Sequence, residues 1–226
     1  MSQVIDINPN KQTNRDGVWG LRTWETFGVL CFVSLLVFFI QDQVIMTKEV
    51  YYHLLGEQLD VERIDALLGL QAKWKWMGYV LIPVVLLLQI ASIAACMFIG
   101  AILLDWKISY RSFFTLVVRA MTVIAVGKVL QTLILLLSNI QSLEDIYRAD
   151  WFSLLGWLGK ENIPELLLVP AGFVNVFEVL FWVLLVAGVR QMSERRRGVG
   201  FVAGTYGVGV VMWCLFLVYL QVSFGS

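Results

Sequence analysis

Five long apolar runs, separated by charged segments, constrain this chain more than any other feature. An α-helix needs about 20 mainly apolar residues to cross the hydrocarbon core of a bilayer. Inside that core every backbone polar group must be hydrogen-bonded within the protein, so each run is expected to be a helix. The sequence therefore predicts an all-α, polytopic membrane helical bundle with five transmembrane helices, which cover about residues 24–45, 76–104, 112–137, 165–190 and 199–222.

The composition supports a membrane protein. Hydrophobic residues make up 59% of the 226 residues, and the mean hydropathy is +0.77. These values are above those of soluble domains. The formal net charge is zero, so the sequence does not favour nucleic acid as a partner. Residues 1–23 are polar and are expected to form a short cytoplasmic tail, with residues 24–226 as the membrane domain.

The distribution of Lys and Arg predicts the orientation of the bundle, because these residues are concentrated in cytoplasmic segments. With the N-terminus inside, the short inner segments carry more cations than the two longer outer loops. The predicted topology thus has the N-terminus inside and the C-terminus outside. The inner cations are Lys11, Arg15, Arg22, Lys107, Arg111, Arg190, Arg195, Arg196 and Arg197.

The connection between the first two runs, residues 46–75, contains a second helical pattern. Leu59, Ile64, Leu67 and Leu68 recur at helical spacing with charges between them. This pattern is typical of a short amphipathic helix. Two placements are open: a helix lying at the membrane interface, or a helix packed on its own bundle.

The fourth run, Pro164 to Arg190, carries Asn175 and Glu178 near its middle. A carboxylate at that depth costs a few kcal/mol on insertion scales, so Glu178 should face protein or a cavity. At about 1.5 Å per residue, Lys128 in the third run lies roughly 15 Å from the outer end of its span, and Glu178 roughly 20 Å. We therefore expect a buried ion pair between Lys128 and Glu178.

Further polar residues extend this candidate cluster, which comprises Asn175, Glu178, Lys128, Gln131 and Arg119. Arg119 lies about two turns inside the third run, on the face opposite Lys128, because nine residues at 100° make two and a half turns. One interpretation of the cluster is a proton or ion relay, or a counter-charge for a substrate. The other is a structural joint that fixes which helices touch.

Other patterns point to packing rather than to chemistry. Gly200 and Gly204 form a small-xxx-small pair, and Gly207 extends the small face, so close helix packing is expected there. The three cysteines lie inside apolar runs and His53 is the single histidine, so we expect no metal site and no cofactor. No catalytic motif is present, so the chain is not expected to be an enzyme.

The stretch NVFEVLFWVLLVAGVRQMSERRRGVGFVAGTYGVGVVMWCLF resembles the last two spans of the Yip1-domain family of membrane proteins, in their bacterial form. The matching positions are Asn175, Phe177, Glu178, Gly188 and the region 198–207. The resemblance is best over the last ~60 residues. It implies five spans with the N-terminus inside, and no catalytic residue set. Eukaryotic members act in vesicle trafficking and bind small GTPases through a cytosolic N-terminal region, for which this chain has only the short tail.

Three functional hypotheses follow. The first is a non-enzymatic Yip1-like scaffold or interaction protein of the bacterial inner membrane, with a role in membrane organisation or trafficking, whose expected partners are the lipid bilayer and either other membrane proteins or further copies of this chain. The second is a transporter or permease subunit that uses the polar set around Glu178 and Lys128. The third is a lipid-organising protein, suggested by the amphipathic connections and by the cluster Arg195 to Arg197.

Overall fold

The described part of the chain is almost entirely helical. The computed structural model describes residues 23–45, 52, 60–138, 152–159, 163–164, 171–172, 174–193 and 198–224. These residues form no strand, and their single isolated β-bridge joins Ser153 to Asn175. The elements are α1 (Thr23–Ile40), η2 (Gln41–Ile45), α3 (Val61–Leu103), α4 (Tyr110–Leu137), α6 (Leu154–Leu158), α8 (Val176–Met192), α9 (Gly198–Val202), η5 (Ala203–Gly207) and α10 (Val208–Phe224). The all-α prediction is confirmed for this part, whereas the predicted tail lies outside it except for Thr23.

Four of the described helical segments are long and apolar enough to cross a membrane: Thr23–Val44, Val61–Leu103, Tyr110–Leu137 and Gly198–Tyr219. They correspond to the first, second, third and fifth predicted runs. The fourth run contains α8, which has 17 residues. At 1.5 Å per residue α8 is roughly 26 Å long, somewhat less than a hydrocarbon core of about 30 Å.

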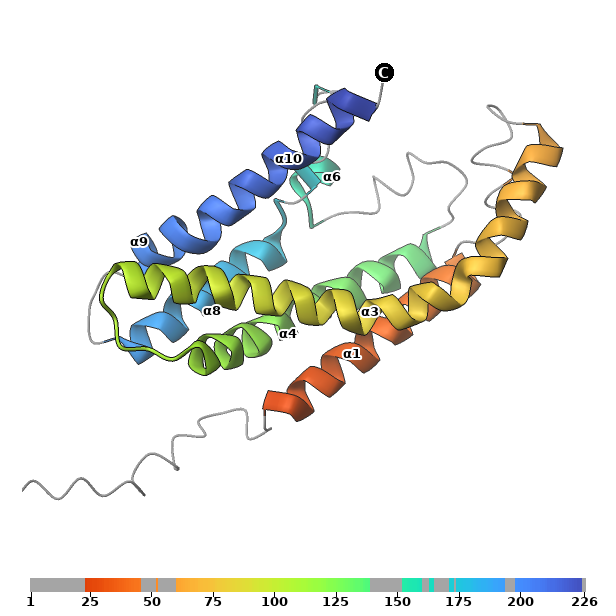
Figure 1. Cartoon of the computed structure of the whole chain (residues 1–226). Helices are drawn as coiled ribbons and strands as arrows, with labels where there is room; N and C mark the ends of the chain where they lie inside the picture. Colours follow the sequence, from red (N-terminus) through yellow and green to blue (C-terminus); the bar gives the residue numbers. More distant parts are fainter. Residues whose placement is uncertain are drawn as a thin grey trace, which may run out of the picture.

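The second run differs from its prediction because it belongs to a much longer helix. Helix α3 has 43 residues, and the amphipathic pattern predicted within residues 46–75 forms its N-terminal part from Val61 onward. The charged residues there, such as Glu62 and Arg63, are good helix formers, so nothing ends the helix before the apolar run begins. Pro83 lies inside α3. A proline removes one backbone hydrogen bond and bends a helix, and α3 curves away from the bundle toward its N-terminus (Figure 1).

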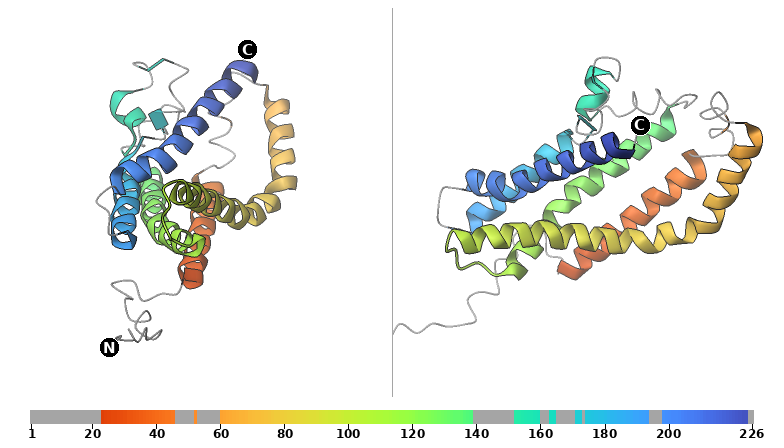
Figure 2. Two further views of the ribbon diagram at one scale, coloured as in Figure 1. Left: turned by 60° about the vertical axis from the view of Figure 1, so that its left-hand side comes forward. Right: turned by 45° about the horizontal axis from the view of Figure 1, so that its top comes forward.

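Helix α4 lies at the centre of the bundle, between α1 and α8 and against α3 (Figure 2). Its buried side chains include Phe113, Val117, Val118 and Met121. They pack with Ile90 and Met97 of α3, Leu30 of α1, and Phe181 and Leu185 of α8 in one hydrophobic cluster. The buried side chains of this cluster are all apolar. Burial of apolar side chains against α4 therefore organises the bundle.

Two hydrogen bonds fix the register of α1 against α4. The Thr23 and Thr115 hydroxyls lie 3.2 Å apart, and Gln41 Nε2 donates to Thr132 Oγ1 over 3.1 Å. Residue numbers increase in the same direction along both helices, so α1 and α4 are parallel. Parallel α1 and α4 are expected because α3, which lies between them in the sequence, runs in the opposite direction.

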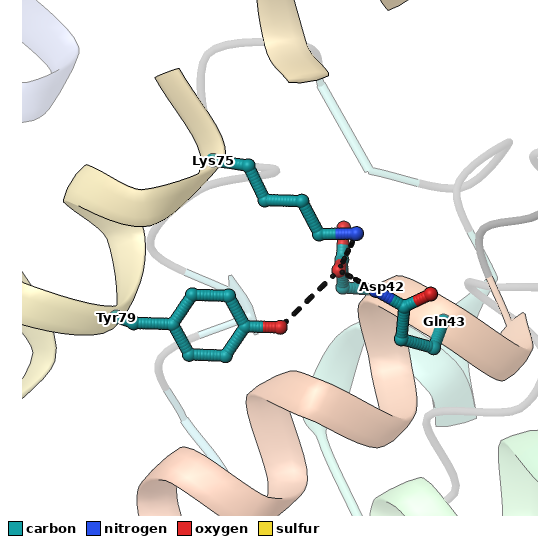
Figure 3. A network of polar contacts seen from close by, with 4 residues as sticks. All are labelled: Asp42, Gln43, Lys75 and Tyr79. Carbon is teal, nitrogen blue, oxygen red and sulfur yellow. Dashed lines mark hydrogen bonds and ion pairs between the residues drawn. The ribbon is translucent and has the colours of Figure 1, made fainter. Parts of the chain in front are cut away.

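A polar contact near the end of α1 attaches it to α3. Lys75 and Tyr79 are four residues apart on α3, so they share a face and reach the same carboxylate (Figure 3). Lys75 Nζ lies 2.5 Å from Asp42 Oδ2, and Tyr79 Oη donates to the same oxygen over 3.4 Å. Gln43 Nε2 also donates to it, over 3.2 Å. Asp42 lies in the π-helical turn η2, and its side chain is only 13% exposed.

Several glycines allow helices to approach closely. Of the three glycines expected to do so, Gly200 and Gly204 make no such contact. A Cβ placed on Gly127 of α4 would come within 2.5 Å of Phe177 Cγ, and a Cβ on Gly188 of α8 would overlap Leu116 of α4. By contrast, a Cβ on Gly200 or Gly204 would meet nothing within 4 Å. The small-xxx-small pair therefore does not face another described helix, because its side of the helix is exposed.

The first testable prediction compares two of these glycines. Changing Gly127→Ala should lower the free energy of unfolding by about 1–3 kcal/mol, because the new methyl group meets the base of the Phe177 ring and not a flexible chain end. Gly200→Ala should be neutral or slightly stabilising. Thermal unfolding of both purified variants in detergent measures the difference. Equal destabilisation by the two variants would contradict this packing.

The Asp42 contact generates a second prediction. A double-mutant cycle on Asp42→Asn and Lys75→Met should give a coupling free energy of about 0.5–1 kcal/mol, the range of partly exposed ion pairs. Lys73→Met serves as the matched control, because Lys73 is exposed on the same helix and forms no ion pair with a described residue. A cycle between Asp42→Asn and Lys73→Met should show no coupling in the same unfolding assay.

Candidate functional site

The segment that carries Asn175 and Glu178 is not one continuous helix. Val174 and Asn175 are non-helical, and α8 begins at Val176. Asn175 has an extended backbone and caps the helix, because its Oδ1 accepts a hydrogen bond of 2.7 Å from the Glu178 backbone N–H. Asparagine is among the preferred residues at this position. The prediction of a single helix over Pro164 to Arg190 is therefore wrong at Asn175, and Glu178 lies in the first turn of α8 rather than in mid-helix.

A short backbone pairing holds this helix start in place. The Leu154 N–H donates to the Val174 carbonyl over 2.8 Å, and the Val176 N–H donates to the Phe152 carbonyl over 3.0 Å. The Phe152 and Phe177 rings meet edge to face, with centroids 5.0 Å apart. The backbone groups next to the break thus find partners within the chain, as a low-dielectric environment requires.

The Glu178 carboxylate joins α8 to the last helical segment of the chain. Glu178 Oε1 accepts a hydrogen bond of 2.6 Å from Tyr206 Oη and one of 3.0 Å from Trp182 Nε1. Trp182 follows Glu178 by four residues on the same face of α8. Tyr206 comes from the π-helical turn η5, and its ring contacts both Phe181 and Trp182. We call Asn175, Glu178, Trp182 and Tyr206 the α8 joint.

Lys128 does not belong to the α8 joint. Its neighbour Gly127 lies against Phe177, so Lys128 and Glu178 do occupy similar levels along the bundle, as the depth estimate implied. Lys128 is nevertheless exposed, and no ion pair forms between it and Glu178. Successive residues on a helix differ by about 100° in direction, so the backbone that touches α8 at Gly127 turns the next side chain away.

The other expected members of the cluster are also separated from Glu178. Gln131 makes no hydrogen bond to Glu178 or Asn175, and Arg119 lies on the side of α4 that faces α1. Of the three glycines, Gly207 approaches the α8 joint, since a Cβ there would come within 2.8 Å of the Trp182 ring. The structure thus brings together Asn175 and Glu178 and disperses the three residues expected from α4.

Trp182 and Tyr206 are the members of the α8 joint that the sequence reasoning missed. The sequence does contain a signal for Trp182: its indole N–H follows Glu178 by four residues, and residues at this spacing face each other on a helix. No comparable signal marked Tyr206, which reaches Glu178 only because η5 packs beside α8. Among the described residues no group of three or more His, Cys, Asp or Glu could hold a metal ion.

Comparisons with known proteins returned no relative for this chain: no protein-family model, curated protein or solved structure matches it.

The α8 joint generates a third prediction. Glu178→Ala should destabilise the protein by about 1.5–3 kcal/mol, because the variant leaves Tyr206 Oη and Trp182 Nε1 without their charged acceptor. Glu178→Gln should cost less, since both bonds end on Oε1 and an amide oxygen in its place can accept both. Tyr206→Phe combined with Glu178→Ala should be clearly less than additive.

Lys128→Gln is the matched control for that experiment, because an ion pair with Glu178 would couple the two positions. We expect a change below about 0.5 kcal/mol for Lys128→Gln and no coupling with Glu178→Gln. Strong coupling between these two positions in thermal unfolding would instead support the ion pair inferred from the sequence.

Proposed function

We propose that this chain is a non-enzymatic, Yip1-like integral membrane scaffold or interaction protein. The observation that carries the proposal is the α8 joint. The Glu178 carboxylate is engaged by Tyr206 and Trp182 and forms a contact between two helical segments. A mid-membrane acid that relays protons or binds a substrate would be expected to face a cavity or an exchangeable partner.

The proposed topology has five spans, with the N-terminus in the cytoplasm and the C-terminus outside, in a bacterial inner membrane. In this topology α8, from the fourth predicted run, would supply the additional span, and its short length is compatible with local thinning of the bilayer or with the non-helical residues that precede it. Antiparallel packing of α4 and α8 supports this order. Gly127 meets Phe177 near one end of the pair, and Gly188 meets Leu116 toward the other.

Helix α10 supports an interaction role. None of its described side chains is buried, and large apolar residues such as Val211, Met212 and Leu215 are more than half exposed. Lipid covers such a surface at no cost in apolar burial, so a partner must contribute close packing or polar contacts. The proposed partners are a second copy of this chain or another membrane protein.

The transporter hypothesis is the alternative, and it rests on Lys128, an exposed cation in the middle of an apolar helix. A flux experiment separates the two. Purified protein reconstituted into sealed liposomes should show no proton or ion flux above empty liposomes under an imposed pH gradient or membrane potential. Flux that disappears in Lys128→Gln or Glu178→Gln would overturn the scaffold proposal.

The interaction role needs a positive test in the membrane. A photo-crosslinking amino acid at Met212 should give a discrete crosslinked product in intact cells, because a protein partner should cover that face. Two differently tagged copies identify a homo-oligomer, and mass spectrometry identifies another protein. The same probe at Leu185, which is fully buried on α8, is the control and should give no intermolecular product. Lipid adducts alone at Met212 would contradict a partner on α10.

A further inference from the structure

A groove between α1 and α4 combines an apolar lining with one cation. Its volume is about 370 Å³, and its walls include Leu30 and Val33 of α1 with Ala125, Val129 and Leu130 of α4. Arg119 and two threonines, Thr26 and Thr122, line the same groove. A space of this kind accommodates a hydrocarbon chain along its length and an anionic group at the level of the arginine.

Arg119 is the described residue with an unpaired buried polar atom. Its Nε is buried and has no hydrogen-bond partner. No described carboxylate forms an ion pair with Arg119. A buried donor without a partner is costly, and an arginine guanidinium binds a phosphate group through parallel hydrogen bonds. Because no described carboxylate pairs with Arg119, an anion from outside the chain is the expected partner of its guanidinium group.

The register of α1 and α4 places Arg119 close to one end of the groove. Thr115 lies level with Thr23, the first residue of α1, through their hydroxyl contact. Arg119 follows Thr115 by one turn, so its Cα lies about 6 Å further along the helix axis. Trp24 is 67% exposed at this end of α1. Tryptophan is enriched at the interface between membrane and water, and a long arginine side chain can extend toward that interface, so we expect the Arg119 guanidinium to reach toward the lipid headgroups at this end of the groove.

The rest of the groove extends from there toward the middle of the bundle. Leu30 and Val33 lie about two to three turns beyond Thr23 on α1, and Val126 and Leu130 lie about two to three turns beyond Arg119 on α4. These side chains are hydrocarbon only, so they offer no hydrogen bond to a free phosphate ion or to a soluble metabolite. They match the acyl chain of a membrane lipid.

We propose that the α1–α4 groove is a binding site for an anionic phospholipid, with the lipid phosphate on Arg119 and one acyl chain along α1 and α4. In the proposed topology the lipid comes from the cytoplasmic leaflet. The site lies on a different side of α4 from the α8 joint. Loss of lipid binding would therefore leave the scaffold proposal intact, and failure of the scaffold proposal would leave this site intact.

The test measures retained lipid and the thermal stability that it confers. Native mass spectrometry of the purified full-length chain should show bound phosphatidylglycerol in preference to phosphatidylcholine when both are supplied in detergent. Phosphatidylglycerol should also raise the melting temperature of the wild-type protein, because a ligand that binds the folded state stabilises it. Inorganic phosphate at the same concentration should not raise it. Stabilisation by phosphate alone would overturn the lipid assignment.

Variants locate the site. Arg119→Gln should reduce the preference for phosphatidylglycerol about tenfold, the loss expected for one charge-assisted hydrogen bond. Ala125→Phe should fill the groove and reduce binding of the lipid while Arg119 remains. Lys128→Gln removes a cation from the same helix outside the groove and should leave the preference unchanged.

Each outcome decides the proposal. If Arg119→Gln and Ala125→Phe both retain the wild-type preference, the groove is not the site. An equal loss in Lys128→Gln would show attraction to general positive charge and would also overturn the assignment. If Arg119→Gln cannot be purified in folded form, the Ala125→Phe variant and the melting temperatures of the wild-type protein still decide the question. A crosslinked second copy that excludes lipid from the groove would assign this face to dimerisation instead.

Discussion

The lack of water between membrane helices is the constraint on which this structure depends. A polar group that enters such a bundle must find its partner within the protein or in the bound lipid, because the hydrocarbon offers none. Glu178 meets this requirement through Tyr206 and Trp182, and the backbone around Asn175 meets it through the cap and the short pairing with residues 152–154. Among the described residues the Nε of Arg119 finds no such partner, and no described carboxylate pairs with its guanidinium, for which the inferred lipid site would supply an anion.

Both π-helical turns take part in polar contacts between helices. The turn η2 carries Asp42 to Lys75 and Tyr79, and η5 carries Tyr206 to Glu178. A π-helical turn adds a residue to the helical cycle and changes the direction of the side chains in it, and such turns are frequent at functional sites. In this chain each turn directs a polar side chain toward a neighbouring helix. Each irregular turn therefore contributes a polar contact between helices.

Apolar packing and polar contacts occur in different parts of the bundle. The centre of the bundle, around Met97, Val117 and Leu185, is hydrocarbon and packs α4 against its neighbours. Small residues such as Gly127 and Gly188 allow α4 and α8 to approach closely, which matters in a membrane because dispersion contacts drive helix association there. Helix α10 takes little part in this packing, so its apolar surface remains for lipid or for a partner.

The sequence by itself determined the class of structure and the approximate helices. Long apolar runs leave few alternatives to helices in a membrane, so the first, third and fifth runs were predicted within a few residues. Boundaries failed where charged but helix-forming residues continue an apolar helix, as in the N-terminal part of α3, and where a polar cap interrupts an apolar run, as at Asn175. Helix propensity alone predicts neither the continuation of α3 nor the break at Asn175, because the contacts of the folded chain decide both.

Only the tertiary structure decided which polar residues meet. The level of Lys128 along the bundle could be estimated from the rise per residue, but its direction depends on how α4 is rotated, and Gly127 rather than Lys128 faces α8. The sequence identified Glu178 as a residue that needs a partner, and it could not identify Tyr206 as that partner. The need follows from the chemistry of one residue, whereas the choice of partner follows from the rotation and packing of whole helices.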